Sequence, residues 1–498
     1  MQETPEDEDT VIRSALQKWF GYERFRGQQE TVIRTVLAEK HALVIMPTGM
    51  GKSLCFQIPA LVNGELRKRS DSTGHPNHRV PLTLVLSPLI ALMKDQVDAL
   101  RRRKIDATFV NSSLSREQRI QRYRGIAEGH YDLLYVTPER FRKEDFVEAL
   151  GKRQITLLAV DEAHCISEWG HDFRPDYTRV QEIRERIGNP TTIALTATAT
   201  PTVQSDIIRQ LGLTEEDVTR FHEGINRPNL RLDVVETWGD DNKLQAIEQA
   251  WKMLADKSGS GIVYFVLIKT LEEFSRLAIE LGIPHVCYHG DLDRGQRRQI
   301  QNRFMKGQSR LVFATNAFGM GIDKEDIRFV LHAECPGSME AYYQEIGRAG
   351  RDGEPAECRF LYDQADLMTQ MEFIRWSNPD RDYYQTLYQL LVDEPEQVQA
   401  FGDEWLRSRL HVRGPQDHRL ETALAMMERH GTVIGTLEED NLTVVGPLAE
   451  ALRDVEQLDA KRESDQRKLL ALVEYVRCEE DRMAFIHHYF GLPYTPDA

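Results

Sequence analysis

The stretch that most constrains this chain is the glycine-containing segment from Met46 to Ser53, MPTGMGKS. It follows the apolar run 42–45 and precedes residues 54–59, which can open a helix. A strand, a glycine-rich turn and a helix in this order form the context of a phosphate-binding loop. We expect nucleotide phosphates to be held by this set: Thr48, Gly49, Met50, Gly51, Lys52 and Ser53.

Each position of this loop has a chemical task. Lys52 can reach the β- and γ-phosphates, and the Ser53 hydroxyl can bind Mg²⁺. Met46 departs from the usual pattern, which starts with Gly at that place. A tight turn before a helix is the alternative interpretation of the segment alone.

Composition bounds the class of protein. A chain of 498 residues is too long for one hydrophobic core, so three or four domains are expected. No apolar run approaches the ~18 residues of a membrane span. The net charge of −16 argues against an overall basic coat for nucleic acid, but it does not exclude a local basic groove.

Cysteine usage and the N-terminus bear on localisation. The six cysteines are scattered and form no C-x-x-C pair, so neither a disulfide framework nor a zinc knuckle is indicated. Residues 1–10 contain five carboxylates and no Lys or Arg, which is unlike a signal peptide. We expect a cytoplasmic protein.

Apolar strands alternate with helical stretches over most of the chain, which indicates α/β domains with parallel sheets covered on both faces. The pattern starts with one group of strands and then restarts without a second phosphate-binding loop. The predicted strands are residues 42–45, 82–88, 133–138, 155–160 and 193–198, then 261–265, 286–289, 311–315 and 329–332.

After residue 362 the strands nearly vanish. Helices are predicted over 364–375, 381–392, 395–409 and 417–430, a hairpin over 432–445, and one long amphipathic helix over 448–490. Helices followed by a hairpin fit a small winged-helix module, and a simple helical cap fits nearly as well.

Two adjacent acids, Asp161 and Glu162, end one predicted strand, which is where ligands bind in open α/β sheets. Asp161 can hold Mg²⁺, and Glu162 can orient and deprotonate the water that attacks a γ-phosphate. Farther along, Arg348 and Arg351 are three residues apart, as on one helix face. They fit either a surface helix paired with carboxylates or an arginine finger that acts across an interdomain cleft.

These motifs, in this order, resemble the RecQ family of superfamily-two DNA helicases over roughly residues 11–362. The resemblance implies two tandem RecA-like domains, 1–212 and 213–362, then a helical region 363–412, a winged-helix-like insert 413–450 and C-terminal helices 451–498. It implies that Tyr22, Arg26 and Gln29 read adenine, although the aromatics there also suit a core. It adds Gln344 to the catalytic set, and Ser87, Lys94 and Thr196 to the set that contacts DNA or couples it to hydrolysis.

The segment 164–175 resembles the aromatic-rich loop that senses single-stranded DNA in this family. Trp169 and Phe173 can stack on bases of any sequence, worth ~1–3 kcal/mol per base. Arg174 supplies positive charge, and His171 belongs to the same polar surroundings. The loop follows Glu162 directly, so a stacked base can shift the catalytic carboxylate.

The sequence departs from the family pattern in three places. Glu168 stands where the loop usually has Gln, and Leu267 and Ile268 stand where many relatives have Ser and Arg. Residues 468–491 resemble the helix of the family's zinc module, but Asp481 replaces its first Cys ligand. We therefore expect no zinc site, and stabilisation of this region by apolar packing.

The resemblance implies an ATP- and Mg²⁺-dependent helicase that moves 3′ to 5′ on single-stranded DNA and unwinds forked duplexes in repair or recombination. A monomer without membrane contact is expected, with single-strand-binding or repair proteins as partners. Two alternatives remain open: a DNA-stimulated ATPase that remodels without processive unwinding, and an RNA helicase.

Overall fold

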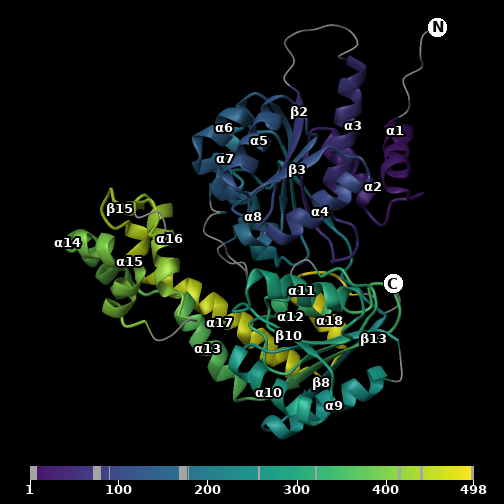
Figure 1. Cartoon of the computed structure of the whole chain (residues 1–498), viewed down its shortest axis with the longest axis vertical. Coiled ribbons are helices and arrows are strands. Elements are labelled where there is room, and N and C mark those ends of the chain that lie inside the picture. The colour runs from purple at the N-terminus through teal and green to yellow at the C-terminus, as the bar shows by residue number, and fades with distance from the viewer. Residues whose placement is uncertain are drawn as a thin grey trace.

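A computed structural model describes residues 8–70, 80–88, 90–167, 177, 179–255, 258–319, 322–412, 417–437 and 441–494. Two α/β domains stack on one another, and a helical region lies beside them (Figure 1). The predicted architecture of two RecA-like parallel-sheet domains with a helical C-terminal part is confirmed.

The first domain is built on a seven-stranded parallel sheet in the order β3-β4-β2-β5-β6-β1-β7. Its central strands are buried along nearly their whole length, because helices cover both faces. The strands are β1 (His41–Ile45), β2 (Pro81–Leu86), β3 (Ala107–Val110), β4 (Leu133–Val136), β5 (Gln154–Asp161), β6 (Thr191–Thr196) and β7 (Val218–His222).

Helices flank this sheet and occupy the connections between its strands. They are α1 (Glu8–Ala15), the π-helical turn η1 (Leu16–Phe20), α2 (Gln29–Leu37), α3 (Leu54–Ser70), α4 (Ile90–Arg102), α5 (Arg116–Ala127), η3 (Pro138–Arg142), α6 (Glu144–Gly151), η4 (Ala163–Ile166), α7 (Val180–Arg186) and α8 (Pro201–Gln210).

The second domain repeats the design with a six-stranded parallel sheet in the order β10-β11-β9-β12-β13-β8. Its strands are β8 (Leu230–Glu236), β9 (Ser260–Tyr264), β10 (Val286–Tyr288), β11 (Leu311–Ala314), β12 (Ile327–His332) and β13 (Ala356–Tyr362). Its helices are α9 (Asp240–Ala255), α10 (Ile268–Glu280), α11 (Arg294–Met305) and α12 (Met339–Ile346).

Strand β7 corrects the predicted boundary between the domains. It pairs with β1 throughout its length, and the Glu223 amide donates to the Ile45 carbonyl at 2.9 Å. The first domain therefore extends past residue 212 to the end of β7. The apolar patterns also do not predict β3, β8 or β13. Strand β8 shows why, because only Leu230 is fully buried and charged residues such as Arg231 and Asp233 interrupt its apolar run.

The C-terminal region consists of a two-helix arm with a separate module inserted between its helices. The arm is α13 (Asp366–Ser377) and α17 (Val455–Arg477), which pack together. The inserted module, residues 378–454, contains α14 (Arg381–Asp393), α15 (Pro395–Arg409), α16 (Arg419–Arg429), a hairpin of β14 (Val433–Ile434) and β15 (Thr443–Val444), and η6 (Glu450–Leu452).

The inserted module has one hydrophobic core of its own. Leu387 of α14 and Leu406 of α15 are buried in the same cluster as Leu420 of α16 and Val433 of β14. The predicted boundary at residue 412 falls inside this core, so the helical region and the hairpin form a single unit.

The predicted long helix over 448–490 is wrong, because α17 ends at Arg477 and α18 (Arg482–Tyr489) starts anew. Cys478 is extended, and the Asp481 side chain accepts a hydrogen bond from the Ala484 amide as the N-cap of α18. Both helices pack on the second domain, where Tyr342 and Tyr475 join their hydroxyls at 3.1 Å. The predicted packing residues all take part in this core: Leu469, Leu472, Tyr475, Phe485 and Tyr489.

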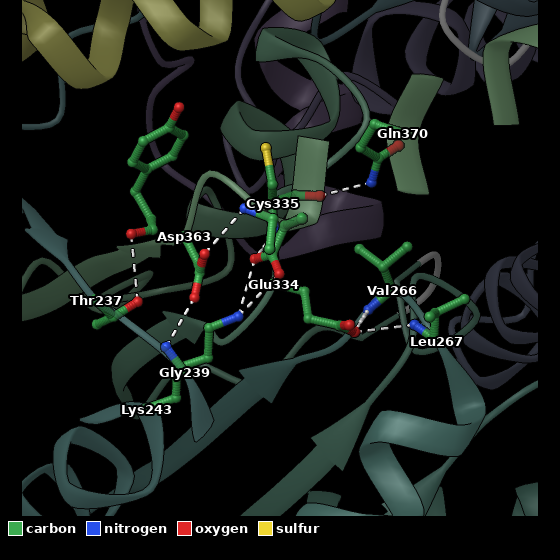
Figure 2. Close-up of polar contacts among 12 residues, drawn as sticks. Thr237, Gly239, Lys243, Val266, Leu267, Glu334, Cys335, Asp363 and Gln370 are labelled. Atoms are coloured by element: carbon green, nitrogen blue, oxygen red, sulfur yellow. Dashed lines mark hydrogen bonds and ion pairs between the residues drawn. The ribbon is translucent and has the colours of Figure 1, made fainter. Parts of the chain in front are cut away.

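A buried polar joint holds the start of the arm on the second domain (Figure 2). Lys243 of α9 is 4% exposed and pairs with Asp366 of α13 at 2.9 Å. The Asp366 carboxylate also accepts the Cys335 amide at 3.1 Å, and Gln370 donates to the Cys335 carbonyl at 2.6 Å. Burial raises the pKa of Asp366 to about 6, and Lys243 acts in the opposite direction.

Candidate active site

The phosphate-binding loop follows β1 and leads into α3. Gly49 and Gly51 have φ of 83° and 78°, the left-handed region that favours glycine. A Cβ on Gly51 would lie 2.8 Å from the Gln29 amide nitrogen, so this position has no room for a side chain. Lys52 donates to the Met46 carbonyl at 2.9 Å. Burial lowers the pKa of Lys52, while Glu162 and Asp161 raise it.

Of the three predicted adenine-reading residues, Gln29 contacts this loop directly. Gln29 is buried, and its amide nitrogen donates to the carbonyls of Met50 at 2.7 Å and Gly51 at 3.1 Å. Its amide oxygen accepts the backbone amide of Arg26 at 2.9 Å. Gln29 therefore ties the segment to the loop, while the Tyr22 ring remains 49% exposed.

Asp161 and Glu162 stand at the carboxyl end of β5, as predicted. Glu162 has φ 50° and ψ 48°, a left-handed conformation that is strained for a residue with a side chain. Burial, and then the Glu162 charge, raise the pKa of Asp161 to about 7. The buried Glu162 Oε2 makes no hydrogen bond, although His164 Nδ1 lies 3.4 Å away, so it remains available to a water or ligand.

A chain of polar contacts connects Glu162 to the second domain. Glu162 Oε2 lies 3.4 Å from His164 Nδ1, and this nitrogen lies 3.0 Å from Thr196 Oγ1. Because the Thr196 hydroxyl donates to the Thr198 carbonyl at 3.1 Å, it accepts from His164, which places the proton on Nδ1.

The last step of this chain crosses the interdomain cleft. Thr198 Oγ1 accepts a hydrogen bond from the Gln344 amide nitrogen at 3.1 Å. Nearby, the Thr48 hydroxyl donates to the Gly347 carbonyl at 3.3 Å. The predicted residues Thr196 and Gln344 thus meet in one network. Since Thr196 is fully buried, it can couple the two domains but cannot touch a DNA strand directly.

Arg348 and Arg351 do not lie on a helix face, which corrects the prediction. Helix α12 ends at Ile346, and both arginines follow in turns, where Gly350 has φ 55°. Arg351 is 10% exposed and binds Asp323 at 2.6 Å. Its stem lies 3.7 Å from the point where a Cβ on Gly49 would be, so it reaches the phosphate-binding loop.

Burial lowers the pKa of Arg351, and so does its neighbour Arg348, while Asp323 raises it. Arg348 is buried beside Gly319, with its guanidinium nitrogen 3.1 Å from that residue's Cβ position. The Nε atoms of both arginines have no partner. Arg351 is a desolvated cation beside the phosphate-binding loop and suits a negatively charged ligand there, whereas Arg348 lies against Gly319 and Tyr264 of the second domain.

These residues fit ATP with Mg²⁺. Cations from Lys52 and Arg351 can meet the phosphates, and the glycine backbone forms the cradle. Asp161, with its raised pKa, and the hydroxyl of Ser53, just before α3, would hold the metal. Bound Mg²⁺ would supply the charge that neutralises the phosphates and returns Asp161 to its ionised form.

The remaining predicted residues concern the nucleic acid. Ser87 is buried at the end of β2 with an unpartnered hydroxyl, whereas Lys94 of α4 is exposed. Residues 168–175 of the aromatic-rich loop lie outside the described residues, and the structure therefore does not place Trp169, His171, Phe173 and Arg174. In the described ranges no helix is long and apolar enough to cross a membrane. No cluster of three or more His, Cys, Asp or Glu there is arranged to hold a metal ion.

Sequence reasoning missed three participants: His164, Thr198 and Asp323. His164 lies two residues after the predicted Glu162, and Thr198 lies two residues after the predicted Thr196. This proximity was the available signal. Asp323 carried no such signal, because nothing in the sequence joins it to Arg351, 28 residues away.

Two family models match the two domains. The DEAD/DEAH box helicase model matches residues 26–206, and the helicase conserved C-terminal domain model matches residues 242–353. The chain is 42% identical over 380 residues to the ATP-dependent DNA helicase RecQ of Bacillus subtilis (strain 168), covering 76% of this chain and 60% of that protein. It is 37% identical over 369 residues to the probable ATP-dependent DNA helicase RecS of the same organism, covering 74% of this chain and 70% of that protein.

Among solved structures, the DUF1998 helicase MrfA bound to DNA and AMPPNP superposes with a TM-score of 0.57 at 19% identity. The match covers 74% of this chain and 52% of that one, and it shows a shared fold. The chain spans 54–60% of the length of the first three curated relatives.

Proposed function

Because the chain belongs to the RecQ family of superfamily-two helicases, we propose that it is an ATP- and Mg²⁺-dependent DNA helicase. It translocates on single-stranded DNA and separates duplexes. The observation that carries the proposal is the polar chain from Glu162 through Thr196 to Gln344, beside an arginine that reaches the phosphate-binding loop. A nucleotide in that cleft would contact both domains at once.

The residues divide the work of hydrolysis between the domains. Lys52 and the glycine backbone bind the phosphates, and Glu162 orients the attacking water and takes its proton. Arg351 leaves Asp323 and stabilises the charge that develops on the γ-phosphoryl oxygens. Gln344 is linked to Glu162 through its hydrogen bond to Thr198, so a movement of Glu162 during hydrolysis in the first domain changes the contacts of the second domain.

Family resemblance supports the finer statements of this proposal. We propose 3′-to-5′ movement, action on forked or branched DNA in repair or recombination, and a monomer in the cytoplasm. Single-strand-binding protein or other repair proteins are the proposed partners. Zinc is not part of the proposal, because Asp481 is the N-cap of α18 and stands where the first thiolate ligand is expected.

An unwinding assay on a labelled forked DNA duplex, with ATP turnover measured in the same reaction, tests the proposal. We expect strand separation that requires ATP and Mg²⁺. Turnover without strand separation would indicate a remodelling ATPase instead. Stimulation by RNA but not by DNA of the same sequence would indicate an RNA helicase.

A further inference from the structure

A cavity of about 790 Å³ lies between the second domain, the arm and the inserted module. On the domain side it is lined by residues just past the ends of three strands: Val266 after β9, Asn316 after β11 and Glu334 after β12. Ligands of open α/β sheets bind at these carboxyl ends. The cavity also reaches Gln344 and Arg348, so it is continuous with the candidate active site.

On the module side, one face of α16 forms the wall. His418, Thr422, Met426 and His430 all line the cavity, and their spacing of four residues places them on a single stripe from the N-cap to the C-cap of the helix. Lys461 and Lys468 of α17 line the cavity at the arm. The wall is therefore polar, with cations at its base.

Charge is distributed unevenly over the inserted module. Residues 378–454 contain fifteen Asp and Glu, seven Arg and no Lys. In the described part of the chain, none of these fifteen carboxylates lines the cavity. Asp465 of α17 does line it, and its carboxylate is held between Lys461 at 2.6 Å and Lys468 at 3.0 Å. The whole lining sets three cations, Arg348, Lys461 and Lys468, against three carboxylates, Glu334, Glu345 and Asp465. Because the module adds no carboxylate of its own over its described residues, its α16 wall does not repel a polyanion in the cavity.

The module also touches the first domain. Glu428 of α16 pairs with Arg142 of η3 at 3.0 Å, across 286 residues of sequence. The turn that carries Arg142 is fixed in turn by Arg186 of α7, which donates to the Phe141 carbonyl at 3.1 Å. Together with the contacts between the domains, this closing contact joins the first domain, the second domain, the arm and the inserted module into a ring, and the cavity lies on its inner side between the last three of these parts.

The two attachments of the module differ in strength. At the second domain, the arm is held by the buried Lys243–Asp366 pair, and breaking a buried pair is strongly destabilising because it leaves a charge without compensation. At the first domain, Arg142 and Glu428 are 29% and 23% exposed. A partly exposed pair of this kind contributes little to stability, because water screens it. The ring therefore opens at the closing contact and not at the arm.

We propose that the inserted module is a clamp that closes over a bound DNA single strand, with Arg142 and Glu428 as its opening point. This inference rests on the proposed function and adds to it the path of the strand. The strand lies in the cavity between the carboxyl ends of the second sheet and the α16 stripe. The acidic outer surface of the module repels phosphates from other positions and confines them to this path.

A topological experiment tests the clamp. In an Arg142→Cys/Glu428→Cys variant, a short bis-maleimide joins the two sites, because an ion pair between long side chains leaves the backbones too far apart for a disulfide. We expect the locked protein to be stimulated in ATP hydrolysis by linear single-stranded DNA, which can thread through the ring. Circular single-stranded DNA of the same sequence should no longer stimulate it.

An Arg407→Cys/Glu421→Cys variant is the matched control, since these two residues pair within the module and a crosslink there does not close the ring. Treated in the same way, it should respond equally to both DNAs. Equal responses of the locked protein to linear and circular DNA would overturn the clamp and leave the proposed function standing. Absence of any DNA stimulation in the uncrosslinked protein would overturn both.

Discussion

Replacing Arg351 by Ala tests the interdomain site most directly. The guanidinium pairs with Asp323, but Asp323 is 82% exposed, so this pair contributes about 1 kcal/mol or less. Breaking the Arg351–Asp323 pair so that the guanidinium can turn to a phosphate therefore requires little free energy. Once Arg351 is removed, Asp323 stays solvated, and we expect the melting temperature to change little.

The catalytic effect should be much larger. Arginine fingers in phosphoryl transfer are worth roughly 10³–10⁵ in kcat. At ~1.4 kcal/mol per tenfold this equals about 4–7 kcal/mol of transition-state stabilisation. The buried stem beside Gly49 indicates that Arg351 acts on the nucleotide phosphates. We therefore expect Arg351→Ala to bind ATP and to lose at least about a thousandfold in turnover.

The assay combines steady-state ATP hydrolysis at saturating single-stranded DNA, binding of a fluorescent ATP analogue, and a melting curve. Asp323→Ala is the matched control, because it removes the same ion pair and keeps the guanidinium. Turnover of Arg351→Ala within about tenfold of wild type would refute the finger assignment. Loss of nucleotide binding with an unchanged melting curve would show that Arg351 contributes to the binding of ATP in the ground state and not specifically to the transition state.

Five further predictions concern four single residues and the metal content. Lys52→Ala should abolish hydrolysis and leave DNA binding largely intact, measured by fluorescence anisotropy. Asp161→Asn should be inactive but more stable to denaturant than wild type, by on the order of 1–4 kcal/mol at pH 7.5. A carboxyl whose folded-state pKa is raised from 3.8 to about 7 loses stability as pH rises, so this gain should shrink at pH 5. Trp169→Ala should lose DNA stimulation and unwinding more than DNA-free hydrolysis. Tyr475→Phe should lower the free energy of unfolding by about 1–2 kcal/mol, because it leaves the buried Tyr342 hydroxyl unpaired. Elemental analysis should find no stoichiometric zinc, and chelators should leave the unfolding curve unchanged.

The first domain shows what can be predicted from sequence. Strand β1, which leads into the loop of Lys52, and strand β5, which ends at Asp161, each have a neighbouring strand on both sides and are largely buried and apolar, so the sequence locates them. Strands β7 and β8 are edge strands of their sheets. They are partly exposed and mix apolar with charged residues, so their sequence pattern resembles that of a loop. The domain boundary was misplaced because it depended on one of them.

Within the site, the chemical identity of each group was predictable but its partner was not. The motifs point to Glu162, Thr196 and Gln344 separately, because each stands in a short pattern with a chemical meaning. Their connection runs through His164 and Thr198 and needs both domains to be folded together. Gln29 is similar: its amide was expected to face adenine, yet in this structure it donates to loop carbonyls, which are equally good acceptors.

The inserted module marks the limit of sequence reasoning for a physical reason. Its helices and hairpin follow from local periodicity, but its role depends on where its surface meets the rest of the chain. Arg142 and Glu428 are ordinary charged residues on ordinary helical turns, and partly exposed charges have no periodic pattern that marks a partner. From its net negative charge alone, this module would be expected not to contact DNA. Only the position of its carboxylates, off the α16 wall, reconciles the acidic composition with a strand that passes beside it.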